Sequence, residues 1–181
     1  TMLFLEMWAV NQMEPADCQN YLTPKHVVPD PPHGYVIPYG DHPYDNENVG
    51  EEVYFHILNH SKKYVHIMTP YLILDSEMIT TLTRAAKSGI EVIIIMPHIP
   101  DKWYAFVLAH TYYKELIQAG VSIYEYTPGF VHAKVFVSDD DTATVGTINL
   151  DYRSLYLHFE CGAYIYDHPV VADIEQDFQE T

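Results

Sequence analysis

Residues 76–97, SEMITTLTRAAKSGIEVIIIMP, contain the change of periodicity that decides the fold. Asp75 or Ser76 can cap a helix that ends at Gly89, because short polar side chains favour helix starts and glycine favours helix ends. Apolar side chains recur at helical spacing within it, at Met78, Ile79, Leu82 and Ala86. The residues after Gly89, 90–96, are nearly all apolar and rich in isoleucine, which is typical of a strand buried on both faces. The segment therefore predicts a helix that packs on a sheet.

Segments of these two kinds continue on both sides of 76–97. Further helices are expected over 51–59, 101–119 and 170–178. Further strands are expected over 64–69, 121–126, 131–138, 144–147 and 159–166. Alternating strands and helices predict an α/β fold with a mixed, largely parallel sheet flanked by helices on both faces, to which the second half adds some antiparallel strands.

The first 48 residues differ in composition from the rest. Residues 1–13 carry apolar side chains at helical spacing, whereas 14–48 are rich in Pro, Asn, Asp and Gly. We therefore expect 1–48 to be the end of a preceding half and a linker, and 49–181 to be the domain. The longest apolar runs fall short of the ~20 residues that a membrane span needs, so the chain itself is expected to have no transmembrane segment.

The charge excludes general binding to polyanions. Lys and Arg number 9 against 25 Asp and Glu, which gives a formal net charge of -16 over 181 residues. Such a surface repels nucleic acid phosphates at long range, so no nucleic acid partner is expected. Cys18 and Cys161 lie far apart and show no ligand spacing, so they predict neither a disulfide framework nor a zinc site.

Chemistry is suggested first by residues 130–139, FVHAKVFVSD. In a strand, His132 and Lys134 would point from the same face. A neutral imidazole can attack phosphorus, and a nearby ammonium can hold the non-bridging oxygens, so the pair suits covalent phosphodiester cleavage.

Polar residues further along the chain fit the same chemistry. Gly146 allows close backbone approach, and the hydroxyl of Thr147 and the amide of Asn149 can donate to phosphate oxygens. Glu160 lies within an otherwise apolar strand. A carboxylate there is costly unless it is paired, and one natural use is to accept the proton of an imidazole nitrogen.

The ordered set His132-x-Lys134-x4-Asp139-x6-Gly146-Thr147-x-Asn149, followed by Glu160, resembles the signature of the phospholipase D superfamily. Flanking residues narrow the resemblance to the C-terminal half of bacterial cardiolipin synthases: 69–71, 120–126, 128–130 and 149–154. The resemblance covers about residues 34–178 and implies a phospholipase D-like half.

The resemblance also implies roles. His132 would be the nucleophile that forms a phosphohistidine, Lys134 and Asn149 would hold phosphoryl oxygens, Thr147 would line the site, and Glu160 would orient His132. It implies no metal and no other cofactor. His158 stands where these synthases commonly have Asn, which puts a second titratable ring near Glu160.

Strand alternation and charge predict the roles of two further residues. Asp139 is seven residues from His132, so strand alternation turns it to the opposite face and predicts a structural role. Arg153 and Lys134 are the two cations after Lys114, which favours phosphate binding by Arg153, and a salt bridge to Asp151 or a neighbouring acid is the alternative.

The chain carries one copy of the full His-x-Lys-x4-Asp motif. Phosphoryl transfer through histidine also needs a group that protonates the leaving alkoxide, and the superfamily meets this need with two motifs. We therefore expect the C-terminal half of a bacterial membrane enzyme that makes cardiolipin from two phosphatidylglycerols, with the second half in the same parent chain. A homodimeric phosphodiesterase or nuclease is the alternative, and a non-catalytic binding domain is a third possibility.

Overall fold

The computed structural model describes residues 2–10, 12, 21 and 33–181. The chain divides into two compact units, Thr1–His33 and Gly34–Thr181. In the first unit, helix α1 spans Met2–Ala9, where apolar residues recur at helical spacing. Residues 14–20 and 22–32 of the expected linker lie outside the described residues.

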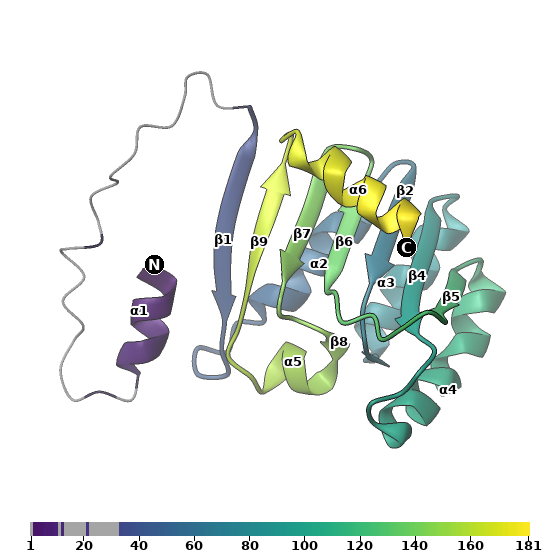
Figure 1. Cartoon of the computed structure of the whole chain (residues 1–181), viewed down its shortest axis with the longest axis horizontal. Coiled ribbons are helices and arrows are strands. Elements are labelled where there is room, and N and C mark those ends of the chain that lie inside the picture. The colour runs from purple at the N-terminus through teal and green to yellow at the C-terminus, as the bar shows by residue number, and fades with distance from the viewer. Residues whose placement is uncertain (1, 11, 13–20, 22–32) are drawn as a thin grey trace. The chain divides into compact units, whose positions relative to one another are not determined.

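The second unit is built on a seven-stranded sheet in the order β1-β9-β7-β6-β2-β4-β5 (Figure 1). The strands are β1 Tyr35–Asp41, β2 Tyr64–Met68, β4 Glu91–Pro97, β5 Ser122–Tyr126, β6 Val135–Ser138, β7 Thr142–Gly146 and β9 Glu160–Tyr166. Strands β2, β4 and β5 pair in parallel, whereas the other four pairings are antiparallel. The mixed sheet is confirmed, but the expectation that it is largely parallel is wrong. Tight turns such as the one between β6 and β7 reverse the chain without a crossover helix.

Helices cover both faces of this sheet, as expected (Figure 1). Helices α2 Val49–His60, α3 Ser76–Lys87 and α4 Trp103–Ala119 share the larger core with one face. Helix α6 Val170–Glu180 packs on the other face through Val171 and Phe178. Strand β4 is buried between these layers, because Ile94 belongs to the larger core and Ile95 to the cluster under α6.

The local signals around 76–97 act as the sequence predicts. The Asp75 carboxylate accepts a hydrogen bond of 2.8 Å from the backbone N–H of Met78 and so caps α3. Gly89 follows the helix at φ 92°, and Gly120 ends α4 at φ 106°. Both glycines have left-handed backbone conformations that other residues rarely adopt.

Residues 34–48, placed in the linker by composition, belong to the second unit. They contain β1, which pairs with β9 from Tyr35 opposite Tyr166 to Asp41 opposite Glu160. Pro38 and Gly40 lie within this strand and obscured it in the sequence. Proline is tolerated because β1 is an edge strand, where one side of the backbone needs no partner.

Three short elements were not expected from the sequence. Strands β3 Leu72–Ile73 and β8 Leu150–Asp151 pair in parallel and form a second, two-stranded sheet. Helix α5 Tyr152–Tyr156 follows β8 directly. Elements this short offer too few residues to show a periodicity, yet they frame the polar residues described below.

Candidate active site

Most of the signature residues meet at one edge of the large sheet. Val135 pairs with Met68, so the segment that leads into β6 lies beside the segment that leaves β2. Strand β7 ends and strand β9 begins at the same edge, because Gly146 pairs with Gly162. His132, Lys134, Thr147, Asn149 and Glu160 therefore come from three segments to one end of the sheet. The carboxyl ends of the parallel strands lie there as well, which is where open α/β sheets bind ligands.

The two residues of the His-x-Lys pair precede the strand. Residues 131–134 are irregular and β6 begins at Val135, so strand alternation does not place His132 and Lys134. The His132 ring is exposed and stacks on Phe130 at 5.6 Å between ring centroids. The Lys134 ammonium donates a hydrogen bond of 2.5 Å to the carbonyl oxygen of His132. This contact holds the cation beside the histidine.

Glu160 is buried, with 7% of its surface exposed. One carboxylate oxygen accepts a hydrogen bond of 2.9 Å from the Ser154 hydroxyl, and the other accepts from the Thr147 hydroxyl. His158 Nδ1 lies 3.5 Å from the first oxygen. Among the described residues, no hydrogen bond joins Glu160 to His132. Glu160 thus ties together the end of β7, helix α5 and the start of β9.

Asn149 has an unsatisfied acceptor at the same place. Its Nδ2 donates a hydrogen bond of 2.8 Å to the Ser154 hydroxyl, whereas its Oδ1 is buried and has no hydrogen-bond partner among the described residues. Buried polar atoms are normally paired, so an unpaired acceptor indicates where a donor of a bound molecule can fit. Ser154 was not singled out from the sequence, although it lies within the stretch 149–154 that carried the family resemblance.

The charge of Lys134 is balanced by neighbouring acids. Burial lowers the pKa of its ammonium group, while the Glu160 and Asp151 carboxylates act in the opposite direction. A cation that is partly desolvated interacts strongly with an anion that enters the site. Lys134 is therefore suited to hold a phosphoryl oxygen.

Gly146 permits a close approach between two strands. A Cβ atom at this position would lie 2.4 Å from the carbonyl oxygen of Cys161 and 2.7 Å from Cα of Gly162. Neither distance is tolerable, and both neighbours are backbone atoms. The close approach allowed by this glycine is thus to β9, and it sets Thr147 beside Glu160.

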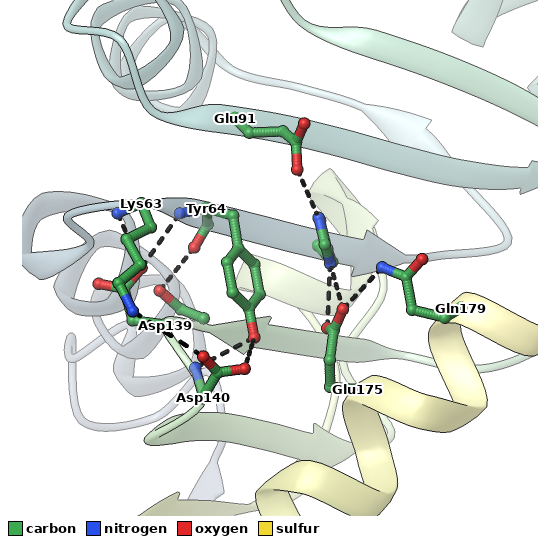
Figure 2. A network of polar contacts seen from close by, with 9 residues as sticks. Lys63, Tyr64, Glu91, Asp139, Asp140, Glu175 and Gln179 are labelled. Carbon is green, nitrogen blue, oxygen red and sulfur yellow. Dashed lines mark hydrogen bonds and ion pairs between the residues drawn. The ribbon is translucent and has the colours of Figure 1, made fainter.

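Asp139 lies at the far edge of the sheet from His132, just after the end of β6. It adopts φ 55° and its carboxylate accepts hydrogen bonds from three backbone N–H groups, those of Lys62, Lys63 and Tyr64 at 2.6, 2.9 and 3.0 Å. Figure 2 shows this turn, with the Tyr64 hydroxyl bonded to Asp140 next to it. Asp139 thus connects the β6–β7 turn to the start of β2.

A partial repeat of the motif occurs at that far edge. His60 and Lys62 also have the spacing His-x-Lys, but no Asp follows five residues after Lys62. The His60 ring contacts the carbonyl oxygen of His56 at the end of α2. The structure therefore separates this pair from the residues around Glu160.

Arg153 lies on α5 and contacts His158 rather than Asp151. Its Nε donates a hydrogen bond of 2.6 Å to His158 Nε2. Asp151 instead caps α5 by accepting a hydrogen bond of 3.0 Å from the Ser154 N–H. The salt bridge between Arg153 and Asp151, considered from the sequence, is absent from the described residues.

Comparisons with known proteins agree with this arrangement. A family model described as cardiolipin synthase, PLD-like domain, matches residues 54–181. Cardiolipin synthase 2 of Bacillus cereus is 36% identical over 179 residues, which cover 99% of this chain and 35% of that protein. An uncharacterized protein of Streptococcus mutans is 56% identical over 182 residues, covering 100% of this chain and 39% of that protein. The chain thus spans little more than a third of the length of these relatives.

The fold is also found in solved structures. The crystal structure of Nuc, a phospholipase D family member from Salmonella typhimurium, has a TM-score of 0.65 at 18% sequence identity and covers 80% of this chain and 93% of that chain. No helix in the described part of the chain is long and apolar enough to cross a membrane. The family match, together with relatives that align with nearly the whole of this chain, shows that the chain belongs to the phospholipase D superfamily, among the PLD-like domains of cardiolipin synthase type.

Proposed function

We propose that this chain forms half of the active site of a phosphatidyltransferase that makes cardiolipin from two phosphatidylglycerols, as the C-terminal half of a bacterial membrane enzyme. The observation that carries the proposal is the meeting of His132, Lys134, Asn149 and Glu160 at one sheet edge in a chain of the cardiolipin synthase family. The family match supports the substrate class, and the geometry supports the roles of nucleophile, cation and amide for these side chains.

In the first half-reaction, an imidazole nitrogen of His132 attacks the phosphorus of one phosphatidylglycerol. An N–P bond forms, the P–O bond to the glycerol headgroup breaks, and the leaving alkoxide takes a proton and departs as glycerol. The Lys134 ammonium and the second N–H of Asn149 Nδ2, the one that does not bond to Ser154, hold the phosphoryl oxygens as negative charge increases on them. The His132 ring is exposed, so a phosphodiester can reach it from the solvent or from the side of a neighbouring half.

In the second half-reaction, a hydroxyl of a second phosphatidylglycerol attacks phosphorus. It gives up its proton, the N–P bond breaks and cardiolipin forms, so two phosphatidylglycerols yield one cardiolipin and one glycerol. The group that moves both protons belongs, in this proposal, to the second motif of the parent chain.

Glu160 and Thr147 position the site in this proposal. Both Glu160 oxygens accept hydrogen bonds from hydroxyl groups, so orientation of His132 by Glu160 requires the exchange of one of these bonds. Glu160 also provides negative charge near the Lys134 ammonium, which opposes the lowering of its pKa by burial.

A homodimeric phosphodiesterase or nuclease is the second candidate, favoured by the likeness to Nuc, of which 93% is covered. Charge argues against the nuclease. A nuclease gains affinity by neutralising several phosphates with Lys and Arg, whereas this chain has 9 cationic residues against 25 acids. We therefore expect negligible affinity for DNA or RNA at physiological salt.

The test uses the full-length protein and vesicles of phosphatidylglycerol labelled with ³²P. Acid quenching during turnover should be avoided, since phosphohistidine is acid-labile; alkaline quenching should trap labelled protein, and His132→Ala should remove both the label and the cardiolipin product. His60→Ala is the matched control, because His60 also precedes a lysine by two residues but lies at the far edge. A protein inert on phosphatidylglycerol but with salt-sensitive micromolar affinity for nucleic acid would favour the nuclease.

A further inference from the structure

A cavity with two cationic side chains in its lining adjoins the candidate active site. It has a volume of about 230 Å³ and is lined by residues from four loops, from the short strands β3 and β8 and from α4 and α5, among them Tyr71, Lys102, Asn149, Arg153 and His158. Asn149 belongs to both the cavity and the site described above. The cavity therefore opens beside the residues proposed to hold the reacting phosphate.

Two cations line this cavity in a chain with a net charge of -16. Lys102 lies over the Tyr71 ring, with Nζ 5.5 Å from the ring centroid. Neither Lys102 nor Arg153 forms an ion pair with a carboxylate in the part of the chain that the structure describes. Asp151 also lines the cavity, but its carboxylate accepts the N–H of Ser154. Two cations against one engaged carboxylate make the cavity suitable for an anion.

His158 connects the cavity to Glu160. Because Arg153 Nε donates to His158 Nε2, that nitrogen is the acceptor and the proton of the neutral ring lies on Nδ1. Nδ1 faces the Glu160 carboxylate at 3.5 Å. The contact through Nε leaves both terminal nitrogens of the Arg153 guanidinium for a ligand, and paired N–H donors suit a phosphate.

We propose that this cavity binds the intact phosphodiester of the acceptor lipid, an inference that rests on the proposed function. Cardiolipin formation brings two phosphodiesters together, of which one reacts at His132 and the other remains unchanged. The attacking hydroxyl of a phosphatidylglycerol is separated from its own phosphate by a three-carbon unit. The unreacted phosphate must therefore bind within one headgroup length of the reacting phosphorus. The cavity lies next to that phosphorus, because Asn149 belongs both to its lining and to the candidate active site.

The subsite would act in the second half-reaction. With the acceptor phosphate held by Lys102 and Arg153, the headgroup hydroxyl faces the phosphohistidine, loses its proton, and forms the new P–O bond as the N–P bond breaks. A neutral alcohol such as ethanol can carry out the same displacement, but it has no phosphate for the cavity to hold. The two acceptors thus separate binding in the cavity from chemistry at His132.

The experiment measures the ratio in which the phosphatidyl group of the phosphohistidine is transferred to two competing acceptors. The full-length protein is incubated with phosphatidylglycerol vesicles and a fixed concentration of ethanol, and cardiolipin and phosphatidylethanol are quantified. Lys102→Gln and Arg153→Gln should each lower the ratio of cardiolipin to phosphatidylethanol about tenfold, since each removes a charged hydrogen bond to the acceptor alone. Lys87→Gln, an exposed cation at the end of α3, should leave the ratio unchanged.

The ratio is insensitive to vesicle binding, because both products come from the same bound donor. An unchanged ratio in Lys102→Gln and Arg153→Gln, with both products reduced equally, would overturn the acceptor subsite and leave the proposed function intact. A wild-type protein that makes neither product would instead refute the proposed function. The two failures are therefore distinguishable.

Discussion

His132 and Asp139, the first and last residues of one short signature, lie at opposite ends of β6. Strand β6 spans Val135–Ser138, so His132 precedes it at the edge with Glu160, and Asp139 follows it at the edge with Lys62 and Lys63. The signature is continuous in sequence, but its two ends lie in different parts of the fold. One end lies in the candidate active site, and the other joins two strands of the sheet.

The first prediction concerns Asp139. Asp139→Asn should lower the free energy of unfolding by about 1–3 kcal/mol. The carboxylate presents two acceptor oxygens to three backbone N–H groups, whereas the amide presents only one. Asn tolerates the positive φ of this position, so the loss reports the hydrogen bonds. Urea unfolding measures it. Asp141→Asn is the control, since Asp141 bonds only to the adjacent Thr142 hydroxyl through its side chain. A stable Asp139→Asn protein without activity would contradict a structural role.

The second prediction concerns the approach of β7 to β9. Gly146→Ala should lower the free energy of unfolding by about 1–3 kcal/mol, because its Cβ would overlap backbone atoms of Cys161 and Gly162. In Gly129→Ala the new Cβ meets the Tyr126 ring at 3.7 Å, an ordinary contact, so that variant should unfold like the wild type. Thermal unfolding compares the two. Equal stability of both variants would show that the strands can separate at no cost.

The third prediction concerns the buried carboxylate of Glu51. Burial raises its pKa to about 7, with the nearby Asp75 acting in the same direction and the hydrogen bond from Tyr156 in the opposite one. The folded state therefore holds this proton more tightly than the unfolded state. The stability that it contributes is complete below about pH 4.5 and is lost as pH rises through about 7.

Glu51→Gln should remove this dependence, because a neutral amide can still accept from Tyr156. The variant should be more stable than the wild type by about 2 kcal/mol at pH 8, with little difference at pH 4.5. Chemical unfolding at both pH values measures the change. Glu52→Gln is the control, since Glu52 is an exposed neighbour on the same helix. A stabilisation that is equal at both pH values would contradict the assignment.

The fourth prediction concerns Lys134 and Glu160. The Glu160 charge raises the pKa of Lys134 against the effect of burial, so Glu160→Gln should lower this pKa. In the full-length enzyme, the alkaline limb of the pH–activity profile should then move to lower pH, besides any loss of maximal rate. Glu125→Gln, on β5, is a control that should keep the wild-type profile shape. An unshifted alkaline limb in Glu160→Gln would exclude Lys134 as the group that titrates there.

The sequence alone determined the longer helices, most of the long strands and the order of the signature. Helix α3 shows why: its apolar spacing, its cap at Asp75 and its end at Gly89 all depend on residues within a few positions of one another. The family resemblance was equally readable, because a signature consists of residue types at fixed spacing. The balance of parallel and antiparallel strands was not readable in this way, and neither was β1, since edge pairing overrode the local preferences of Pro38 and Gly40.

Only the tertiary structure decided which side chains act together. It separated Asp139 from His132, gave Glu160 hydroxyl partners on two other segments, and brought Lys102 to the same cavity as Arg153. Lys102 and Arg153 are 51 residues apart, so no periodicity relates them. Local interactions determine where a helix begins and ends, whereas contacts between distant residues depend on how the whole sheet and its helices pack, which short-range patterns do not encode.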